Sequence, residues 1–358
     1  MTQDLLDLYS DYLLCTFGQA TATGLEQVVQ GSVSHDQISR GLGGKQRTGA
    51  ELWRIAKPFV RKIQSPDGVL IVDDTISEKP YSDENDIVCW HYDHTSGKVI
   101  KGINLLTALY HVPSRELSVP VEFRLIAKTE TYVDQKDGKT KRRSPLTKNE
   151  YYCTMLQQAV NNQIPFKYVL NDVWYASADN MNFVKHKLHK EFVMPLKTNR
   201  KVALSADNKR KGIYVRVDAV EIEPNAVRLV YLEGVSFPML LAKQVFENKD
   251  GSTGVLFLVT SDTSLTYDGI TSLYQQRWTI EPFHKSLKQN AALERSPAHT
   301  VTTQTNHIFA SLCAWIKLEM LKRKSKLNHF ALKAHLYLQA VQSALNALRL
   351  LQPVVLAA

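Results

Sequence analysis

Hydrophobic and polar positions divide the chain into helical ends and a strand-rich middle. Apolar residues recur at helical spacing between Leu5 and Val29, so residues 1–64 are expected to be helical. From Gly68 onward the pattern changes to short runs of apolar and β-branched residues bounded by turn residues, which is typical of strands. The strands predicted in this part lie at residues 69–72, 99–110, 117–126, 168–170 and 192–196. After Thr260 the pattern is again mainly helical.

The segments between these strands indicate the fold. A polar, basic loop is expected at residues 134–145, and helices are expected at 148–162 and 178–189. The resulting order β-β-β-α-β-α-β is that of an RNase H-like fold, an α/β class with a mixed sheet and flanking helices. A β-rich insertion follows, with short strands predicted at residues 213–217, 226–232, 239–245 and 255–259.

We therefore expect four regions along the chain. The helical N-terminal region at 1–64 has DNA binding as its expected role, because Ser34 is placed to cap a helix whose next residues are polar and basic. Helical pairs of this kind also occur in plain scaffolds, so this role stays open. The other regions are an RNase H-like catalytic domain at 65–199 and 257–300, a β-rich insertion at 200–256 and a C-terminal helical region at 301–358.

Composition favours a polyanion as the partner. The 358 residues include 44 Lys and Arg against 35 Asp and Glu, a net charge of +9, and the pI is about 9.2. The four cysteines are scattered without a CxxC pair, which argues against a zinc site and against a disulfide framework. No apolar run of about 18 residues and no signal-peptide pattern occurs, so we expect no membrane partner and a cytoplasmic location.

Residues 274–288 carry the most informative pattern in the chain. If this segment forms one helix, its apolar side chains gather on one side, at Leu273, Ile280, Phe283 and Leu287. The opposite side then carries Tyr274, Arg277, Glu281, Lys285 and Lys288. A carboxylate among cations and a tyrosine suits a surface that holds both a metal ion and phosphate oxygens. The alternative is an ordinary solvated amphipathic helix.

Three acidic residues are candidates for metal-dependent phosphoryl transfer. Asp74 and Asp172 each end an apolar strand, and Glu281 lies in the predicted helix. Convergent carboxylates can hold two metal ions that activate a water and stabilise the leaving oxygen. Oxygen ligands suit Mg²⁺, with Mn²⁺ as a substitute. A single aspartate at a strand end is more often a turn or capping residue, but the combination favours catalysis.

The order of these residues resembles a known signature. The spacing Y-x2-R-x3-E-x6-K from Tyr274 to Lys288 is similar to the YREK signature of DDE-type insertion-sequence transposases of the insertion-sequence-four-like group. The sequence VDDT at 72–75 resembles the motif that carries the first aspartate in this group. The sequence LNDVWY at 170–175 resembles the motif of the second aspartate.

The resemblance implies a cut-and-paste DNA transposase, which cleaves at transposon ends and transfers the 3′ ends into target DNA. It implies metal ligation by Asp74, Asp172 and Glu281, and DNA phosphate contacts by Tyr274, Arg277 and Lys288. The implied partners are the inverted repeats at the transposon ends and the target DNA. The active complex is expected to be a homodimer, in a bacterial cell and associated with the nucleoid when bound to DNA.

Residues near the signature carry open interpretations. Trp278 is either a core residue or an aromatic platform for an unstacked base, and Lys285 is expected to bind DNA. His284 either meets solvent, which we prefer, or contacts a phosphate. Basic clusters at residues 139–143 and 197–211 either follow the DNA backbone or are solvated loops.

The pattern leaves two questions open. Strand alternation puts Asp73 and Asp74 on opposite faces of a strand that is apolar on both sides, so alternation does not choose between them. The resemblance favours Asp74 as the ligand, and on this reading Asp73 tolerates amidation better. For the function, the alternatives are a non-catalytic DNA-binding protein derived from a transposase and an RNase H-like structure-specific nuclease.

Overall fold

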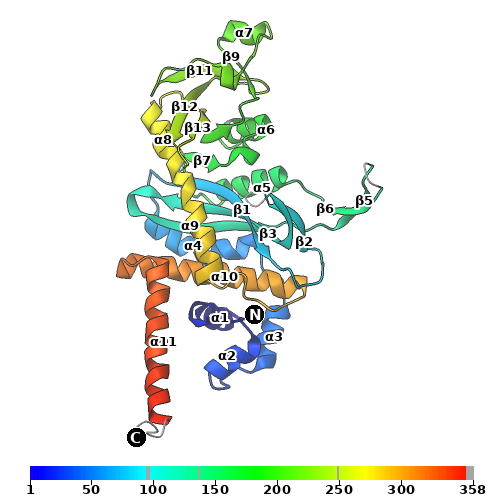
Figure 1. The fold of residues 1–358 in the computed structure, drawn as a ribbon, viewed down its shortest axis with the longest axis vertical. Helices are drawn as coiled ribbons and strands as arrows, with labels where there is room; N and C mark the ends of the chain where they lie inside the picture. Colours follow the sequence, from blue (N-terminus) through cyan, green and yellow to red (C-terminus); the bar gives the residue numbers. More distant parts are fainter. Residues whose placement is uncertain (94–96, 136–137, 248–249, 352–358) are drawn as a thin grey trace. The chain divides into compact units, whose positions relative to one another are not determined.

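The computed structural model describes residues 1–93, 97–135, 138–247 and 250–351 (Figure 1). Its internal contacts divide the chain into two compact units. The first unit consists of Met1–Thr48, Ser77–Asn85 and Phe283–Ala358, and the second consists of Gly49–Ile76 and Asp86–Pro282. None of the helices in the described ranges is both long and apolar enough to cross a membrane.

The first unit is helical, as the patterns at both ends of the chain predict. Its helices are α1 (Gln3–Cys15), α2 (Ala22–Val28), α3 (His35–Gly43), α10 (Val301–Ser325) and α11 (His329–Leu351). Helix α10 lies at the centre, because α1, α3 and α11 all pack against it. Ser34 caps α3 in a capping box with Gln37, so the predicted cap is confirmed.

A buried histidine links α10 to α1. His307 is 1% exposed, its Nδ1 lies 2.9 Å from the Tyr9 hydroxyl, and its Nε2 lies 2.9 Å from the Ala292 carbonyl oxygen. Because a carbonyl oxygen only accepts, Nε2 carries the proton and the Tyr9 hydroxyl donates to Nδ1. Burial lowers the pKa of His307 to about 4, so the ring is neutral at neutral pH.

The second unit is built on a large sheet with flanking helices. The helices are α4 (Gly49–Ile63), α5 (Lys148–Asn161), α6 (Ala178–Asn182), α7 (Ala206–Arg210) and α8 (Tyr267–Gln275). The strands are β1 (Val69–Glu78), β2 (Val88–Asp93), β3 (Lys98–Val112), β4 (Leu117–Leu125), β5 (Glu130–Val133), β6 (Thr140–Arg143), β7 (Tyr168–Asn171), β8 (Glu191–Leu196), β9 (Lys201–Ala203), β10 (Val215–Arg216), β11 (Val227–Leu232), β12 (Met239–Glu247) and β13 (Thr253–Thr260). Helices α4 and α5 pack against β4, and α8 packs against β8, β12 and β13 (Figure 1).

The strand order is β10-β9-β11-β12-β13-β8-β7-β1-β3-β2, with β4 also paired to β3. Strands β1, β7 and β8 are parallel neighbours, whereas β13 pairs antiparallel with β8. The predicted fold class is therefore confirmed: an RNase H-like mixed sheet with flanking helices and helical terminal regions. The strands predicted between residues 200 and 256 continue this sheet, because β11 pairs with β12 and β12 pairs with β13.

Four strands in the described residues were not expected from the pattern, namely β2, β5, β6 and β9. The predicted loop at residues 134–145 holds strand β6, which pairs with β5 in a separate hairpin; residues 136–137 of that loop lie outside the described residues. All four residues of β5 are exposed, so no alternation of apolar and polar residues marks it as a strand. The prediction of a loop is wrong at β6, because Thr140–Arg143 pairs with β5 although it contains no apolar residue.

The segment expected to be a single helix at 274–288 is interrupted. Helix α8 ends at Gln275, a 3₁₀ turn spans Gln276–Thr279, and α9 spans Ile280–Asn290. Pro282 explains the interruption, because it has no N–H for the carbonyl one turn earlier and its ring crowds that carbonyl. Proline is tolerated where it stands because it lies in the first turn of a new helix. The polar residues therefore belong to three short elements and not to one continuous helical face.

Gly68 precedes β1 at a position where no larger residue fits. A Cβ atom there would lie 2.4 Å from the Tyr110 hydroxyl oxygen and 2.8 Å from the Pro165 carbonyl oxygen. The tyrosine side chain can shift, but a backbone carbonyl moves only together with its chain. This close approach fixes the beginning of the strand that leads to Asp73 and Asp74.

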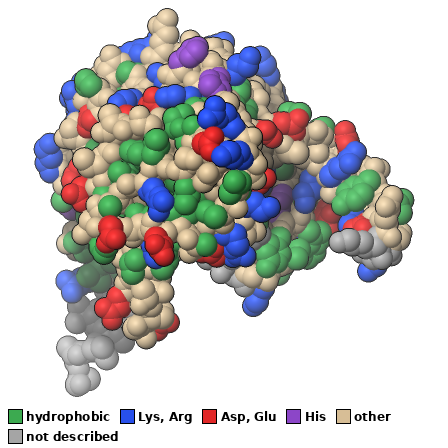
Figure 2. All heavy atoms as spheres, turned by 90° about the horizontal axis from the view of Figure 1, so that it is seen from above, with side chains coloured by type: hydrophobic (Ala, Val, Ile, Leu, Met, Phe, Trp, Pro, Cys, Tyr) green, Lys and Arg blue, Asp and Glu red, His purple; other side chains and the backbone are tan. Residues whose placement is uncertain are grey.

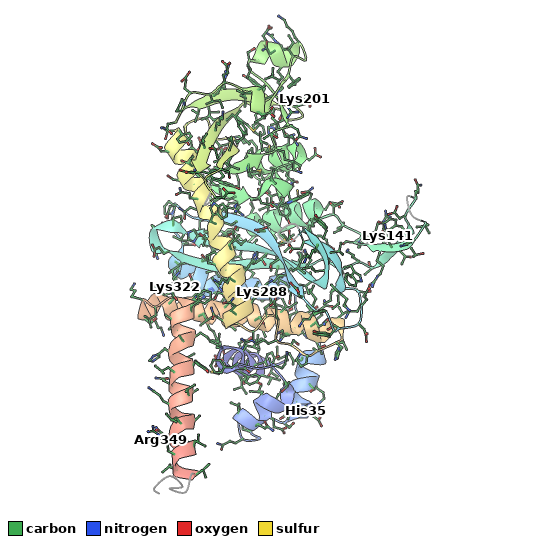
Figure 3. All side chains as sticks on the ribbon, in the orientation of Figure 1. His35, Lys141, Lys201, Lys288, Lys322 and Arg349 are labelled. Atoms are coloured by element: carbon green, nitrogen blue, oxygen red, sulfur yellow. The ribbon has the colours of Figure 1, made fainter. Side chains whose placement is uncertain are left out.

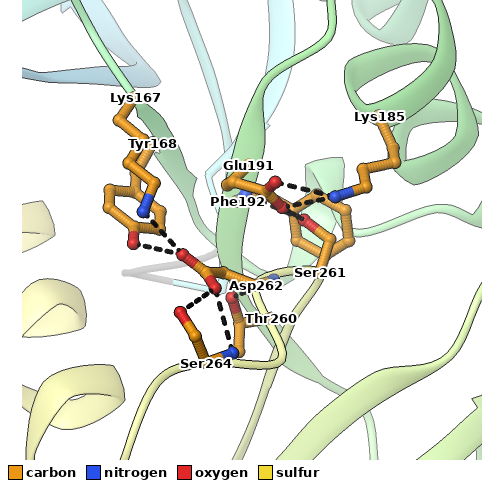
Figure 4. Close-up of polar contacts among 9 residues, drawn as sticks. All are labelled: Lys167, Tyr168, Lys185, Glu191, Phe192, Thr260, Ser261, Asp262 and Ser264. Carbon is orange, nitrogen blue, oxygen red and sulfur yellow. Dashed lines mark hydrogen bonds and ion pairs between the residues drawn. The ribbon is translucent and has the colours of Figure 1, made fainter.

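A polar cluster ties the start of β7 to the end of β13 (Figure 4). Asp262 accepts hydrogen bonds from Lys167 Nζ at 2.8 Å and from the Tyr168 hydroxyl at 2.6 Å. Burial alone would raise the pKa of Asp262, but these bonds hold it below its usual range. Because Tyr168 begins β7 and Asp172 follows its end, this cluster and Asp172 lie at opposite ends of the same strand.

Candidate active site

The two aspartate motifs lie side by side at the carboxyl ends of the neighbouring strands β1 and β7. The register of the parallel neighbours β1 and β7 pairs Val72 with Asn171. Asp73 and Asp172 are the residues that follow this last pair on the two strands. Besides burial, the charge of Asp172 raises the pKa of Asp73, and the charge of Asp74 raises the pKa of Asp172, so the three carboxylates lie close enough to repel one another.

Hydrogen-bond donors surround the Asp74 carboxylate. Its Oδ2 accepts from Lys148 Nζ and from Asn104 Nδ2, both at 2.7 Å, and its Oδ1 accepts from the Tyr175 hydroxyl at 2.8 Å. Burial alone would raise the pKa of Asp74, but the Lys148 charge and these hydrogen bonds hold it below its usual range. Both carboxylate oxygens of Asp74 are therefore already engaged by the protein.

Sequence reasoning missed these three partners of Asp74. Lys148 is the first residue of α5 because Thr147 caps that helix in a capping box. Asn104 was detectable in principle, since a buried amide inside an apolar strand must find a hydrogen-bond partner. Nothing in the sequence marks Tyr175, because its partner lies far away along the chain.

Asp73 faces the arginine of the signature. Arg277 Nη1 lies 3.9 Å from Asp73 Oδ2, and Arg277 Nη2 donates to Glu281 Oε1 at 3.2 Å. The Arg277 side chain is only 9% exposed, whereas that of Glu281 is 53% exposed. Burial raises the pKa of Asp73 to about 7, and the neighbouring charges of Asp172 and Asp74 add to the rise. One buried guanidinium thus lies between carboxylates of β1 and α9.

Asp172 is held at the end of β7 by its neighbours. Its Oδ1 accepts from the Trp174 N–H at 2.9 Å and so caps the short 3₁₀ turn Val173–Tyr175. Asn171 is fully buried, and its Oδ1 accepts from the Tyr152 hydroxyl at 2.9 Å. Burial raises the pKa of Asp172 despite the hydrogen bond from the Trp174 N–H. The strand end therefore holds this acid in one orientation.

The aromatic residues of the signature region differ in exposure. Tyr274 is 5% exposed, and burial raises its pKa to about 12. Trp278 is 52% exposed and is therefore not a core residue. The Arg277 guanidinium lies 4.4 Å from the centroid of the Trp278 ring. Of the two aromatic side chains, Trp278 alone presents a broad surface to solvent.

The cations further along α9 have partners within the first unit; Figure 3 labels Lys288 on this helix. Lys285 Nζ lies 5.5 Å from the centroid of the Phe330 ring, and Lys288 Nζ lies 3.1 Å from Glu294 Oε1. His284 is 9% exposed, so the expectation that it meets solvent is wrong. The helical wheel could not show this burial, because it contains no information about the residues that cover α9.

Charge is mixed over the surface. In the β5–β6 hairpin Lys141 pairs with Asp134, and near α7 Lys211 pairs with Asp207. On the face shown in Figure 2, Lys and Arg side chains are interspersed with acidic and apolar ones. The two basic clusters predicted from the sequence are therefore partly neutralised by acidic residues of the chain itself.

The acids have the donor chemistry of a metal site but not the spacing of one. Among the described residues, no three acidic, histidine or cysteine side chains stand close enough together to hold a metal ion. The donor chemistry fits, because Asp73 and Asp172 supply carboxylate oxygens at the ends of β1 and β7, and Glu281 shares Arg277 with Asp73. Ligation by all three acids requires the Arg277 guanidinium to withdraw from between them.

Comparison with protein families decides the class. Residues 1–212 match the family described as DDE superfamily endonuclease, and residues 145–317 match the family described as transposase DDE domain. The chain belongs to the DDE superfamily of endonucleases. Both matches contain Asp172, the first alone contains the VDDT motif, and the second alone contains Glu281. A search of curated proteins found no match for this DDE endonuclease.

Membership of the DDE superfamily indicates the general activity of this protein. It is a transposase-type endonuclease, and its partner is DNA. Nucleases of this superfamily generally use divalent metal ions, in agreement with the oxygen donors at the ends of β1 and β7. The comparisons thus agree with the predicted transposase class at the level of the superfamily.

Proposed function

We propose that this DDE endonuclease is an insertion-sequence transposase of the insertion-sequence-four-like group with the YREK signature. It cleaves DNA at the transposon ends and joins the 3′ ends to target DNA by cut-and-paste transposition. One observation supports this most strongly: Arg277 of the signature contacts both Glu281 and the VDDT motif. Two motifs far apart in the sequence thus meet at one buried cation.

The chemistry follows from the acids at this point. The group that attacks the phosphodiester is water or a DNA 3′ hydroxyl, and no covalent bond to the protein forms. Mg²⁺ ions, with Mn²⁺ as a substitute, supply the activation of the attacking oxygen and the stabilisation of the leaving oxygen. Asp172, Glu281 and one aspartate of the first motif are the residues that would hold them.

Asp73 and Asp74 are both candidates for the first ligand. The sequence resemblance favours Asp74. The contacts favour Asp73, because Asp73 lies beside Arg277, whereas hydrogen bonds from Lys148, Asn104 and Tyr175 already engage both carboxylate oxygens of Asp74. We therefore assign the ligand role to Asp73 and a positioning role to Asp74.

The proposal includes roles for the other signature residues. Lys285 and Lys288 are assigned to DNA phosphates, Trp278 to an unstacked base, and Tyr274 and Arg277 to the strand nearest the acids. The helices at 1–64 bind the transposon-end repeats, the segments 65–199 and 257–300 form the catalytic domain with the insertion at 200–256, and 301–358 is the C-terminal helical region, whose residues 352–358 lie outside the described residues. The active complex is a homodimer in the bacterial cytoplasm.

A cleavage assay with a matched acid variant tests this function. The full-length protein is incubated with Mg²⁺ and a labelled duplex of the inverted repeat that flanks its gene, and strand cleavage and end binding are measured separately. We expect Asp172→Asn to lose cleavage and keep end binding, because phosphate contacts do not involve this acid. Asp268→Asn, a change at an exposed position in the first turn of α8, should keep both activities.

Two outcomes would overturn the proposal. Wild-type protein that binds the repeat but cleaves with neither Mg²⁺ nor Mn²⁺ would favour a non-catalytic DNA-binding protein. Cleavage of branched DNA without preference for the repeat would favour a structure-specific nuclease. Near-wild-type cleavage by Asp172→Asn would reject the active-site assignment itself.

A further inference from the structure

A lysine stands beside the acids although it belongs neither to the aspartate motifs nor to the signature. Lys148 Nζ lies 2.7 Å from Asp74 Oδ2. The Tyr175 hydroxyl donates to the other oxygen of Asp74, and burial together with the charges of all three aspartates raises the pKa of this tyrosine. The lysine therefore reaches the group of carboxylates from α5, an element that carries none of the three.

The hydrogen bonds of Asp74 do not depend on this lysine. Asn104 Nδ2 donates to Asp74 Oδ2, and the Tyr175 hydroxyl donates to Oδ1, so each oxygen of Asp74 has a neutral donor. The Lys148 side chain is 44% exposed, and an exposed ion pair contributes little to stability. The fold therefore gains little from a cation at this position.

The ammonium of Lys148 has donors to spare. It carries three N–H groups, and among the residues that the structure describes Asp74 is its one hydrogen-bond acceptor. Lys148 is the first residue of α5, a helix of 14 residues, so the positive end of the helix dipole adds to its charge. Glu150, the acid of this first turn, is engaged by Thr147 in the capping box. The beginning of α5 is therefore suited to an anion that binds next to the acids.

We propose that the Lys148 ammonium binds a non-bridging oxygen of the phosphate that is cleaved, and that Asp74 positions this ammonium. The contact rests on the proposed function, since it assumes a DNA strand at the acids. Attack on the phosphorus needs compensation of the negative charge on the non-bridging oxygens, and a cation already held in place supplies it without reorganisation. Lys148 forms no covalent bond and transfers no proton. The role also explains an aspartate whose two oxygens are both engaged within the VDDT motif.

A double-mutant cycle on DNA binding tests the contact, with one change on the protein and one on the DNA. The duplex of the inverted repeat carries either its native phosphate at the cleavage position or an uncharged methylphosphonate. Kd is measured for both with full-length protein and a metal chelator. The ratio of the methylphosphonate Kd to the native Kd should be about 5- to 10-fold larger for the wild type than for Lys148→Met. Comparing ratios cancels the repulsion between acids and phosphate, which both proteins share.

Lys167→Met is the matched control for this cycle. Lys167 Nζ lies 2.8 Å from Asp262 Oδ2, and its side chain is 56% exposed, so it forms the same kind of ion pair beside the start of β7. Its substitution should leave the ratio at the wild-type value. Lys148→Gln lacks the charge but keeps a donor for Asp74, so it gives the same comparison if Lys148→Met unfolds.

Single-turnover cleavage at saturating protein measures the contribution of Lys148 to the reaction. With Mg²⁺, Lys148→Met should cleave about 100-fold more slowly than the wild type. Lys148→Arg should recover most of the rate, because arginine keeps the charge and several donors. Adding Asp74→Asn to Lys148→Met should slow cleavage no further, because Asp74 acts through the lysine.

Several results would overturn the contact. They are equal Kd ratios in the wild type and Lys148→Met, an equal change of the ratio in Lys167→Met, and a Lys148→Arg variant no faster than Lys148→Met. Further slowing by Asp74→Asn would reject the positioning role of Asp74. Cleavage of the unmodified repeat separates this failure from failure of the proposed function: a cleaving wild type without the ratio difference rejects the lysine contact alone. A wild type that binds the repeat and cleaves with neither Mg²⁺ nor Mn²⁺ rejects the function.

Discussion

Changing each aspartate of the VDDT motif to asparagine should separate stability from cleavage. Asp74→Asn keeps the shape of the side chain, and its carbonyl oxygen can still accept from Asn104 Nδ2, but its NH₂ group then faces the Tyr175 hydroxyl, which must accept instead of donate. The substitution removes the negative charge opposite Lys148 Nζ, 2.7 Å away. A hydrogen bond to a charged group contributes about 1.5–3 kcal/mol and a neutral one about 0.5–1.5. The Lys148 side chain is 44% exposed, so solvent screening places the loss at the low end, about 1 kcal/mol.

Asp73→Asn should have the opposite profile. It removes one of two carboxylates that crowd each other at the ends of β1 and β7, so the free energy of unfolding should stay level or rise. Under the proposed function it also removes a metal ligand. Ligands of this kind contribute several kcal/mol to the transition state, which corresponds to at least about a 100-fold loss of the cleavage rate.

Thermal unfolding and single-turnover cleavage measure the two effects independently. A loss of 1 kcal/mol lowers Tm by about 2–4 °C in a domain of 150–250 residues. We expect a lower Tm with measurable cleavage for Asp74→Asn, and an unchanged or higher Tm without cleavage for Asp73→Asn. If Asp74→Asn is inactive at unchanged Tm while Asp73→Asn remains active, Asp74 is the ligand and the reasoning from contacts is refuted.

Three further predictions concern stability. Gly68→Ala should lower the unfolding free energy by about 1–3 kcal/mol, because its Cβ would meet a fixed carbonyl oxygen; Gly18→Ala, with nothing within 4 Å, should leave Tm nearly unchanged. The folded-state pKa of His307 is about 4 against 6.5 in the unfolded chain, so its contribution is fully present above pH 6.5 and about 3 kcal/mol is lost as the pH falls towards 4. His307→Gln should flatten the urea midpoint over that pH range, and an unchanged slope would contradict the burial argument. Thr147→Ala should cost about 1 kcal/mol by removing the α5 cap, whereas Thr154→Ala on the exposed side of that helix should change Tm little; equal effects would reject the cap.

The strand core was predictable because burial leaves a strong pattern in the sequence. The run that leads into Asp73 is fully buried, and strands of this kind are apolar at every position. The β5–β6 hairpin left no such pattern, since neither face of β5 is buried. The helix break before Ile280 was detectable from Pro282 alone, but the amphipathic spacing on both sides concealed it. Periodicity reports which residues can share a face and does not report where the backbone bends.

The candidate site was predictable only as a set of acids. Strand endings in the sequence located Asp172 and the VDDT pair, because polar residues stop an apolar run. The choice between Asp73 and Asp74 depends on the side chains that each carboxylate meets, and these come from segments far away along the chain. No local rule contains that information. The same holds for the burial of Arg277, whose partners lie on β1 and α9.

Arg277 shows why the acids and the signature depend on one another. A guanidinium that is 9% exposed needs a nearby carboxylate to compensate for its lost hydration, and Glu281 at 3.2 Å is a closer partner than Asp73 at 3.9 Å. The carboxylates repel one another and need a positive charge among them. In the protein without DNA or metal ions, Arg277 supplies that charge. Under the proposed function, divalent cations at Asp73, Asp172 and Glu281 would take over that charge and displace the guanidinium. The nearest anion for it would then be the DNA phosphate at the acids, so metal binding and DNA binding by this arginine should strengthen each other.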